Sequence, residues 1–372
     1  VYSPDEQTVF RIGEEEHRGY GLDRYKFGQW LLKEAIRAGA ELLDNSVTLK
    51  PTLSQNFVTG VIAKVKGEKV ELKSKVVIDA SGMNAVIRKN LSSEMGFEKI
   101  DREDIITCYR EIRSASSEIK DKYGKIYLSQ EKAPGGYYWI FPMKKTINTG
   151  IGVQIKPGFP DPKKNFYSYV VDKPILKSTE IIHSGGWIVA TRRPLSKLVG
   201  NGVLIVGDAA CQVNPMHGGG IGPSITGGRL AAQTVVKAFS KDDFSEKSMW
   251  DYAKNYMRKI GAKHAALDIF RIFLQSTTDD ELSYGMKKRV LREEDVLRAS
   301  LEGDIRLSVL EKLGRAVKAP MKPRLLLRLR KAARLMKQAK ALYLNYPDPE
   351  DFAKWKLKVD TLFSLAKNYF SH

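Results

Sequence analysis

The chain has 372 residues, of which 42% are hydrophobic and 28% are charged, so it can bury one large core or two linked ones and is not expected to be disordered. Lysine and arginine outnumber aspartate and glutamate by 62 to 43, which gives a formal net charge of +19. We therefore expect an anionic partner. Charge alone leaves nucleic acid, an anionic membrane surface and phosphorylated substrates open.

Two cysteines, Cys108 and Cys211, exclude a disulfide framework, and no cysteine or histidine spacing is typical of a zinc site. We predict no metal centre. The sequence contains no run of 18 apolar residues and no secretory signal pattern. These features predict a cytoplasmic protein.

The first segment begins with Val1, and residues 2–12 read as a strand with no preceding element to pair with. We therefore expect the sequence to be cut inside a domain. Residues 22–39 predict a helix, because apolar residues recur at helical spacing, Asp23 can cap the start and Gly39 can end it.

The next elements are strands that lead into an α/β sheet. Short β-rich runs come first, and an apolar strand then ends in Asp79, Ala80, Ser81 and Gly82. A buried strand that runs into a glycine turn is typical of a parallel sheet. The predicted strands are 47–49, 57–65, 69–72 and 76–78.

Residues 106–193 change to short alternating strands with glycine and proline between them, which predicts an inserted antiparallel sheet. A buried strand then returns at 203–206, and a helix is predicted over 223–239. The expected fold class is α/β with an α+β insert. The predicted parts are 1–18 (strands of the substrate domain), 19–82 and 199–239 (α/β domain), 83–198 (antiparallel-sheet substrate domain) and 240–372 (helical, basic).

The C-terminal part contains a basic amphipathic helix. Residues 311–340 hold eleven lysines or arginines and one acid. Its apolar residues recur every three or four positions, which predicts one buried face; they are Leu325, Leu329, Ala332, Met336, Ala339 and Tyr343. The basic face either docks on an anionic membrane or orients the substrate phosphate, or it is simply a solvated face. Loss of liposome binding on replacing Arg328, Arg330 and Arg334 would separate membrane docking from a solvated face.

The strongest local signal is the segment 203–232, in which a strand leads to Asp208 and then to a loop with glycines at 218, 219, 220 and 222 before a helix. Such a loop leaves backbone N–H groups open to a flat ligand, and the helix N-terminus adds partial positive charge. A glycine-rich turn alone is more often only topological. The order of strand, Gly-Asp-Ala-Ala, Asn-Pro, glycines and helix resembles the second flavin motif of the para-hydroxybenzoate hydroxylase type of FAD proteins.

Two further segments resemble the same superfamily, the helix that carries Arg24 and residues 76–89. In the second, Ala80-Ser81-Gly82 replaces the commoner Ala-Asp-Gly, so Asp79 is the acidic group there. The resemblance implies a truncated three-layer FAD-binding domain. The cofactor-binding residues it implies are Arg24, Val47, Gly82, Asp208, Pro215, Gly218, Gly219, Gly220 and Ile221.

The segment YYWIFPMKKTINTG, residues 137–150, narrows the family. It is similar to the pattern Tyr-x-Trp-x-Phe-Pro-x7-Gly of geranylgeranyl reductases, and with TRRPL at 191–195 and LYLNYP at 342–347 it resembles the archaeal digeranylgeranylglycerophospholipid reductases. A period of two places alternate aromatic residues on one strand face, where they could wall a long hydrocarbon, although an aromatic core strand is the simpler alternative. The implied substrate-binding residues are Tyr137, Trp139, Phe141, Pro142 and Gly150.

The resemblance also exposes an absence. Members begin with a Gly-x-Gly-x-x-Gly turn for the FAD diphosphate, and this sequence has none, so we expect a missing N-terminal segment and poor FAD binding. Equimolar flavin copurifying with this polypeptide would contradict that expectation.

The implied reaction is flavin-dependent reduction of isoprenoid double bonds in membrane-lipid precursors, with hydride from the flavin and a proton from an acid. His217, in the glycine loop, is the candidate proton donor, and a bound water is the alternative. Expected partners are a prenylated phospholipid or prenyl diphosphate, an electron donor such as NAD(P)H or ferredoxin, and the inner face of an anionic membrane.

Three alternatives stay open: a flavin monooxygenase or halogenase of the same fold, a binding-only relic, and a nucleic-acid-binding protein. The halogenase pattern Trp-x-Trp-x-Ile-Pro differs at Tyr137 and Phe141. Nucleic acid is disfavoured because no recognised motif appears.

Overall fold

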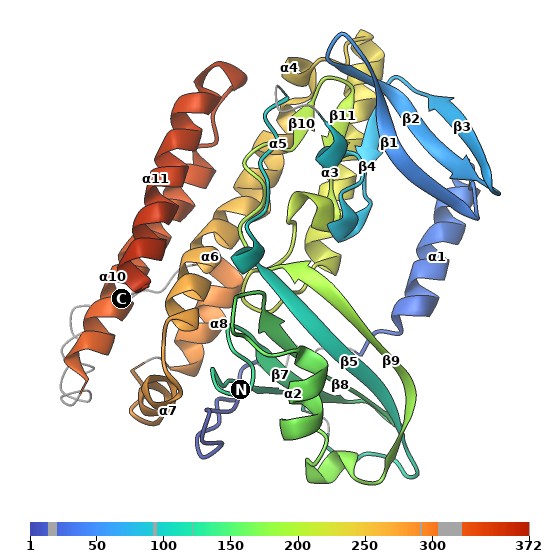
Figure 1. The fold of residues 1–372 in the computed structure, drawn as a ribbon. Coiled ribbons are helices and arrows are strands. Elements are labelled where there is room, and N and C mark those ends of the chain that lie inside the picture. Colours follow the sequence, from blue (N-terminus) through green and yellow to red (C-terminus); the bar gives the residue numbers. More distant parts are fainter. Residues whose placement is uncertain (14–20, 92–94, 122, 291, 304–321, 372) are drawn as a thin grey trace.

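The computed structural model describes residues 1–13, 21–91, 95–121, 123–290, 292–303 and 322–371 (Figure 1). Three sheets precede a C-terminal half built of helices. The largest sheet has the strand order β6-β7-β8-β5-β9 with every neighbouring pair antiparallel. Its strands are β5 (Ile105–Ala115), β6 (Lys125–Tyr127), β7 (Tyr137–Pro142), β8 (Thr146–Gln154) and β9 (Thr179–Ala190).

The two smaller sheets belong to the α/β part. Strand β4 (Val77–Asp79) pairs in parallel with β11 (Val203–Ile205), and β10 (Val199–Gly200) completes that sheet. The five-stranded sheet is inserted between these two partners in the sequence, as predicted. The other sheet is the antiparallel meander β1 (Ser46–Ser54), β2 (Phe57–Val65) and β3 (Glu68–Lys73). The domain boundaries themselves stay predictions.

The N-terminal segment corrects one prediction. Residues 2–12 do not form a continuous strand: Tyr2 bridges Val9 in antiparallel fashion and Tyr127 in parallel fashion. The chain turns because the Glu6 N–H donates to the Ser3 carbonyl at 2.8 Å and Glu6 takes a positive φ of 58°. Local side-chain hydrogen bonds and a proline favour this turn over an extended strand.

The first helix, α1 (Arg24–Arg37), confirms the helix predicted near the N-terminus. The Asp23 side chain accepts a hydrogen bond from the Lys26 N–H and so caps it. None of its residues is buried, and Trp30 is 54% exposed. Figure 1 shows α1 at the side of the molecule, near β9 and the three-stranded meander.

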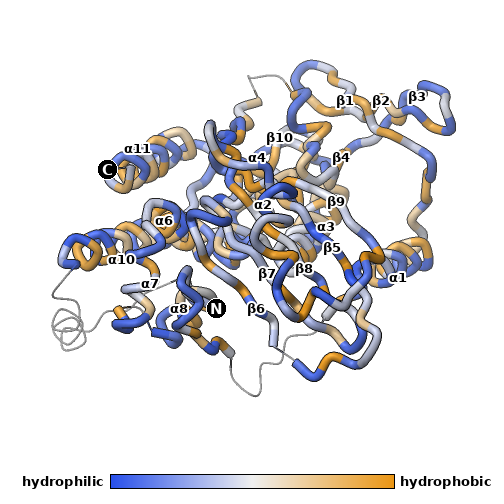
Figure 2. Tube along the Cα trace, turned by 60° about the horizontal axis from the view of Figure 1, so that its bottom comes forward, coloured by the Kyte–Doolittle hydropathy of each residue, from blue (hydrophilic) through white to orange (hydrophobic). Residues whose placement is uncertain are grey.

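The C-terminal half packs helices around α6, and Figure 2 shows their apolar stretches in orange. The predicted apolar face of the basic helix, now α10, is buried against α6 and α11. No helix among the described residues is long and apolar enough to cross a membrane. Residues 311–321 of the basic stretch lie outside the described residues. The helices are α2 (Pro162–Tyr169), α3 (Ile221–Lys241), α4 (Glu246–Met249), α5 (Asp251–Tyr256), the π-helical turn Met257–Gly261, α6 (Ala262–Gln275), α7 (Asp279–Lys287), α8 (Glu293–Glu302), α10 (Pro323–Leu344) and α11 (Phe352–Phe370).

A buried ion network joins α6 to the segment 191–195. The carboxylate of Asp268 accepts hydrogen bonds from the Arg193 N–H at 3.1 Å, from the Arg193 guanidinium at 3.3 Å and from the Arg271 guanidinium at 2.6 Å. Arg271 also reaches Asp104 at 2.9 Å. Asp268 is fully buried, so its charge is compensated by the two arginines and not by water.

Candidate functional site

The aromatic stripe is the set Tyr137, Trp139 and Phe141 on one face of β7. Tyr138 and Ile140 point the other way and are each 1% exposed, within a core cluster that includes Phe166 of α2. Neighbouring rings of the stripe lie 6.0 and 6.4 Å apart between centroids. The alternation predicted from the sequence therefore holds, and the three rings are left facing away from the core.

Gly150 makes room for the stripe. It lies opposite Trp139 in the register of β7 and β8. A Cβ atom at position 150 would stand 2.4 Å from a ring carbon of Trp139 and 2.5 Å from the Tyr109 carbonyl oxygen. The indole therefore lies across the glycine, and its N–H donates to the Asn148 side chain at 3.1 Å.

We expect Gly150→Ala to displace the Trp139 indole and to lower the free energy of unfolding by about 1–3 kcal/mol, the usual range for overpacking. Chemical denaturation measures this loss. The control is Gly185→Ala on β9, where the nearest atom to a new Cβ is 3.8 Å away. Equal stability of the two variants would contradict the steric role of Gly150.

The glycine loop, residues 214–220, faces the stripe. It follows β11 and a short 3-10 turn, Gly207–Ala210, that carries Asp208. Tyr137 donates its hydroxyl hydrogen to the His217 carbonyl at 2.7 Å and so ties sheet to loop. Helix α3 starts after Gly220 with no capping side chain, which leaves its positive end open.

The sheet–loop cavity lies between the stripe and the glycine loop and has a volume of about 660 Å³. It brings together residues predicted separately as cofactor-binding and substrate-binding. Those on its wall are Arg24, Tyr137, Trp139, Phe141, Asp208, Pro215, His217 and Gly218.

The remaining predicted residues lie elsewhere. Gly219, Gly220 and Ile221 continue the loop into α3, and Gly150 lies beneath Trp139. Pro142 ends β7. Val47 is 61% exposed on β1, and Gly82 sits in a turn after β4 with φ +66°, both away from the cavity wall. Among the described residues, no group could hold a metal ion.

Asp79 organises that turn. Its carboxylate accepts hydrogen bonds from the Ser81 N–H at 3.0 Å and from the Arg88 N–H at 2.9 Å, and its side chain is buried. It therefore shapes the strand end rather than facing the cavity.

The surroundings of the glycine loop shift the pKa values of Asp208 and His217. Partial burial raises the pKa of the Asp208 carboxyl, and Arg24 opposes this rise. His217 is exposed to solvent over part of its surface, but the neighbouring protein partly desolvates its ring and lowers its pKa, and Lys263 lowers it further. Because His217 Nδ1 accepts a hydrogen bond from the Gly219 N–H at 3.1 Å, the neutral ring carries its proton on Nε2.

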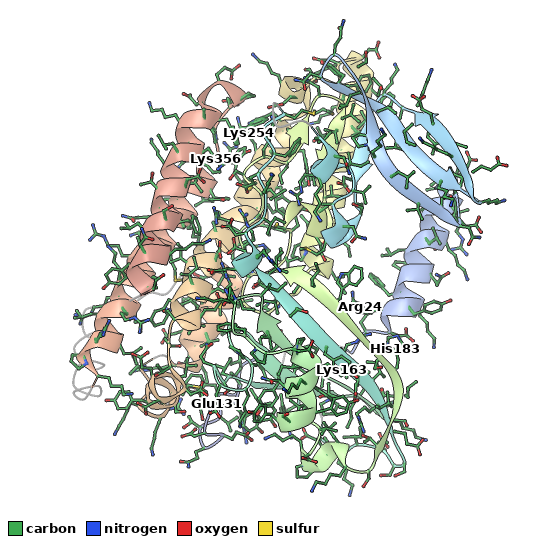
Figure 3. All side chains as sticks on the ribbon, viewed as in Figure 1. Arg24, Glu131, Lys163, His183, Lys254 and Lys356 are labelled. Carbon is green, nitrogen blue, oxygen red and sulfur yellow. The ribbon has the colours of Figure 1, made fainter. Side chains whose placement is uncertain are left out.

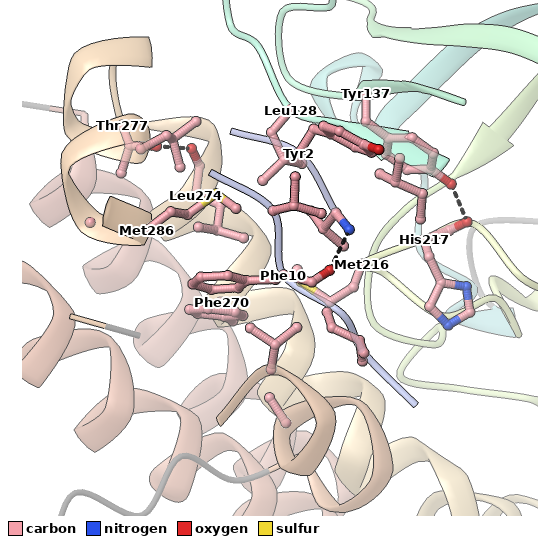
Figure 4. Close-up of a pocket in the computed structure, with 18 of the residues that line it drawn as sticks. Tyr2, Phe10, Leu128, Tyr137, Met216, His217, Phe270, Leu274, Thr277 and Met286 are labelled. Atoms are coloured by element: carbon pink, nitrogen blue, oxygen red, sulfur yellow. Dashed lines mark hydrogen bonds between the residues drawn. The ribbon is translucent and has the colours of Figure 1, made fainter. Parts of the chain in front are cut away.

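A second space, the helical cavity, adjoins the first and has a volume of about 730 Å³ (Figure 4). Its wall is mainly apolar and includes Phe270, Leu274, Met286 and Leu325. Six residues line both cavities: Leu128, Tyr137, Met216, His217, Leu274 and Leu282. The two spaces are therefore neighbours across a wall that contains the Tyr137–His217 hydrogen bond.

Several cavity residues carried no sequence signal. Cys108 and Arg110 of β5, and His183 and Trp187 of β9, line the sheet–loop cavity. Burial raises the pKa of the Cys108 thiol to about 11. Their alternation along β5 and β9 was available from the sequence, but nothing marked which face would be open.

His264 is buried on α6 behind the loop, and its Nδ1 has no hydrogen-bond partner among the described residues. Burial, with Lys263 and His217, lowers its pKa to about 3. Because the unfolded chain binds a proton below pH 6.5 and the folded chain does not, stability is lost as pH falls from 6.5. We expect a loss of about 2 kcal/mol by pH 5.

Urea denaturation between pH 7 and pH 5 measures this loss. The variant His264→Gln should flatten the pH dependence, whereas His183→Gln, at an exposed position on β9, should leave it unchanged. The same slope in wild type and His264→Gln would show that other groups cause the loss.

Comparison with known proteins places the chain. Residues 104–189 match the family described as the geranylgeranyl reductase catalytic domain, which spans the five-stranded sheet. A digeranylgeranylglycerophospholipid reductase of Sulfolobus acidocaldarius is 38% identical over 98% of this chain and 81% of its own length. The chain belongs to the digeranylgeranylglycerophospholipid reductase family. A relative from Methanothrix thermoacetophila with the same name is 29% identical over 83% of this chain and 78% of its own length.

One solved structure agrees with this assignment, and another shares the fold. A geranylgeranyl bacteriochlorophyll reductase-like protein of Thermoplasma acidophilum is 26% identical, with a TM-score of 0.70 over 89% of this chain and 81% of that chain. The myxobacterial chondrochloren halogenase shares the fold, with a TM-score of 0.57 over 88% of this chain and 75% of that chain at 16% identity. Membership of this family confirms the predicted fold class and the predicted oxidoreductase class, with a flavin as cofactor.

The residues present fit the ring end of a flavin. The α3 N-terminus has no capping side chain, and a Cβ at Gly220 would come within 3.1 Å of an Asp208 carboxylate oxygen. An open helix end suits the electron-rich edge of a flavin, and a carboxylate suits a hydroxyl chain. Asp208, Pro215 and Gly218 to Gly220 are thus the residues that would hold it.

Proposed function

We propose that this chain carries the reaction centre of a flavin-dependent reductase that saturates double bonds in the geranylgeranyl chains of archaeal-type phospholipids. One observation carries the proposal: the aromatic stripe and the glycine loop with Asp208 line the same cavity. The rings would hold an alkene on one side, while the loop holds the cofactor on the other. The names of the relatives support the substrate class.

The hydride for one alkene carbon would come from a reduced flavin held by these residues. The residues of this chain do the rest: Arg24, Asp208 and the loop glycines bind the cofactor, and Tyr137, Trp139 and Phe141 orient the hydrocarbon and exclude water. An isolated alkene accepts hydride poorly, so a proton must reach the second carbon. We assign its delivery to the protonated, imidazolium form of His217 through Nε2, the nitrogen that makes no hydrogen bond to Gly219.

The helical cavity gives the rest of the hydrocarbon a place to lie. Its wall takes apolar residues from α6, α7 and α10 and from the N-terminal segment 1–13, and it meets the sheet–loop cavity at Tyr137, Met216 and His217. Burial of each methylene in such a wall contributes about 0.8 kcal/mol. A prenyl chain longer than the first cavity would therefore extend into the second.

Mass spectrometry of prenyl phospholipids incubated with the protein and chemically reduced FAD tests the function, with FAD in large excess to offset the weak binding expected of this polypeptide. We expect a gain of two hydrogens per double bond. A gain of one oxygen would indicate a monooxygenase, and no change in lipids that nevertheless bind would indicate a binding-only protein.

We also propose that α10 contacts an anionic membrane through Arg330 and Arg334. Both are exposed and have no ion-pair partner among the described residues. Arg328 differs from the prediction: it is 8% exposed and its guanidinium pairs with Glu281 at 3.1 Å. Buried within this pair, Arg328 belongs to the packing of α10 on α7 and not to a membrane face.

Replacing Arg330 and Arg334 by glutamine should weaken binding to vesicles that contain anionic lipid by roughly 30-fold, since each basic residue near such a surface contributes about 1 kcal/mol. Vesicle cosedimentation at low salt measures this change. The control pair Lys64→Gln and Lys69→Gln removes the same charge from the β2–β3 meander. Equal losses in the two double variants would mean that net charge alone drives binding.

A further inference from the structure

The sheet–loop cavity has a cationic end. Arg24 and Arg110 both line it, as does His183, which Figure 3 labels together with Arg24. Neither guanidinium has an ion pair or a hydrogen bond among the described residues. Partial burial lowers the pKa of Arg110, and the nearby Arg24 lowers it further, as expected for two close cations. Asp208 is the only carboxylate in the described wall.

The register of the sheet leaves space around the Arg110 side chain. Trp139, Gly150, Arg110 and Gly185 form one row across β7, β8, β5 and β9. Arg110 therefore has a glycine on either side, and the indole of Trp139 extends across one of them. A guanidinium held between two glycines in a partly buried cavity can use its fork of N–H donors for a bidentate anion such as phosphate.

The two cavities differ in polarity, which favours one orientation of an elongated ligand. Arg110 lies level with Trp139, and Tyr137 lies next to Trp139 at the wall that the two cavities share. Beyond that wall, the helical cavity is mainly apolar. A molecule with an anionic head and a long hydrocarbon tail matches this sequence of environments. Aromatic rings and then aliphatic side chains would cover the tail.

We propose that Arg110 binds the headgroup phosphate of the prenyl lipid substrate in the sheet–loop cavity, level with Trp139. The proposal rests on the proposed function, because it takes the hydrocarbon in these cavities to be a substrate tail. The same anion chemistry could come from the diphosphate of the cofactor, which is why the test contains a flavin arm. Arg110 is thus a specificity-determining residue that fixes which end of the lipid faces outward.

Tryptophan fluorescence provides a binding readout without turnover, since Trp139 and Trp187 both line the cavity. The probes are geranylgeranyl phosphate and the uncharged alcohol geranylgeraniol. Arg110→Gln should weaken binding of the phosphate by about 10- to 100-fold, as expected for hydrogen bonds to a charged group. Binding of the alcohol should not change, and Arg110→Lys should recover part of the loss.

Arg102→Gln is the matched control, because this arginine is exposed and does not line the cavity. Equal weakening for both probes, or no change for either, would overturn the proposal. So would a loss of flavin affinity in Arg110→Gln with an unchanged ratio of phosphate to alcohol binding, since that result would assign Arg110 to the cofactor. If wild type binds the phosphate through Arg110 but reduces no lipid, the headgroup site stands and the proposed function fails.

Discussion

Asp268→Ala should lower the free energy of unfolding by about 3–5 kcal/mol, the range for breaking a buried ion pair by removing one partner. The carboxylate of Asp268 receives the backbone N–H of Arg193 and both the Arg193 and Arg271 guanidiniums. Without it, Arg193 keeps a buried charge and loses its ion-pair partner, and only the more distant carboxylates of Glu98 and Asp104 remain to compensate it. Because Arg271 lines the sheet–loop cavity, the same change should also weaken ligand binding.

Thermal or urea denaturation measures the effect on stability, and Glu350→Ala is the control. Glu350 pairs with Lys247 at 2.8 Å, but both side chains are more than half exposed and screened by solvent, so its loss should change stability little. If Asp268→Ala lost no more stability than the control, water would be entering the network and solvating the arginines in place of Asp268.

His217→Ala should reduce the turnover number for alkene reduction by about 10²–10⁴-fold, the usual contribution of a positioned proton donor. The lowered pKa of His217 keeps the ring neutral near pH 7, so the protonated form grows as pH falls. The wild-type rate should rise in the same direction. Single-turnover oxidation of reduced flavin by the lipid measures both effects.

A second variant separates proton delivery from loop order. An asparagine at position 217 can still accept the Gly219 hydrogen bond, because its side-chain oxygen lies at the distance that suits a partner two residues on. His217→Asn should therefore keep the loop conformation but lose the alkene reduction and the increase of its rate at low pH. Recovery of activity in His217→Asn would leave a bound water as the proton source.

The sequence correctly predicted those parts of the fold in which one local repeat determines which residues face the core. The alternation in β7 placed Tyr137 and Trp139 on one face, and the spacing in α10 placed Leu329 and Met336 in the core. Both patterns are set by a repeat of two or about 3.6 residues. The sequence pattern also identified Gly150, and the structure explains why a glycine is needed there: the Trp139 indole lies across it.

Other features depend on partners far apart in the chain. Arg110 lies in an ordinary strand sequence, and only the pairing of β5 with the glycines of β8 and β9 opens its surroundings. Arg328 looked like its neighbours Arg330 and Arg334, yet the position of α7 buries it beside Glu281. Residues 2–12 have strand propensity, but a turn at Pro4 outweighs it.

The hydrogen bond from Tyr137 to the His217 carbonyl belongs to the walls of both cavities. Any substitution of Tyr137 that opens this shared wall to a bulkier lipid tail also releases the loop that carries the proposed proton donor. Breadth of substrate range and speed of reaction are therefore linked through one tyrosine. Variants selected for new lipids should more readily change at Leu274 or Leu282, where the shared wall can be reshaped without freeing the loop.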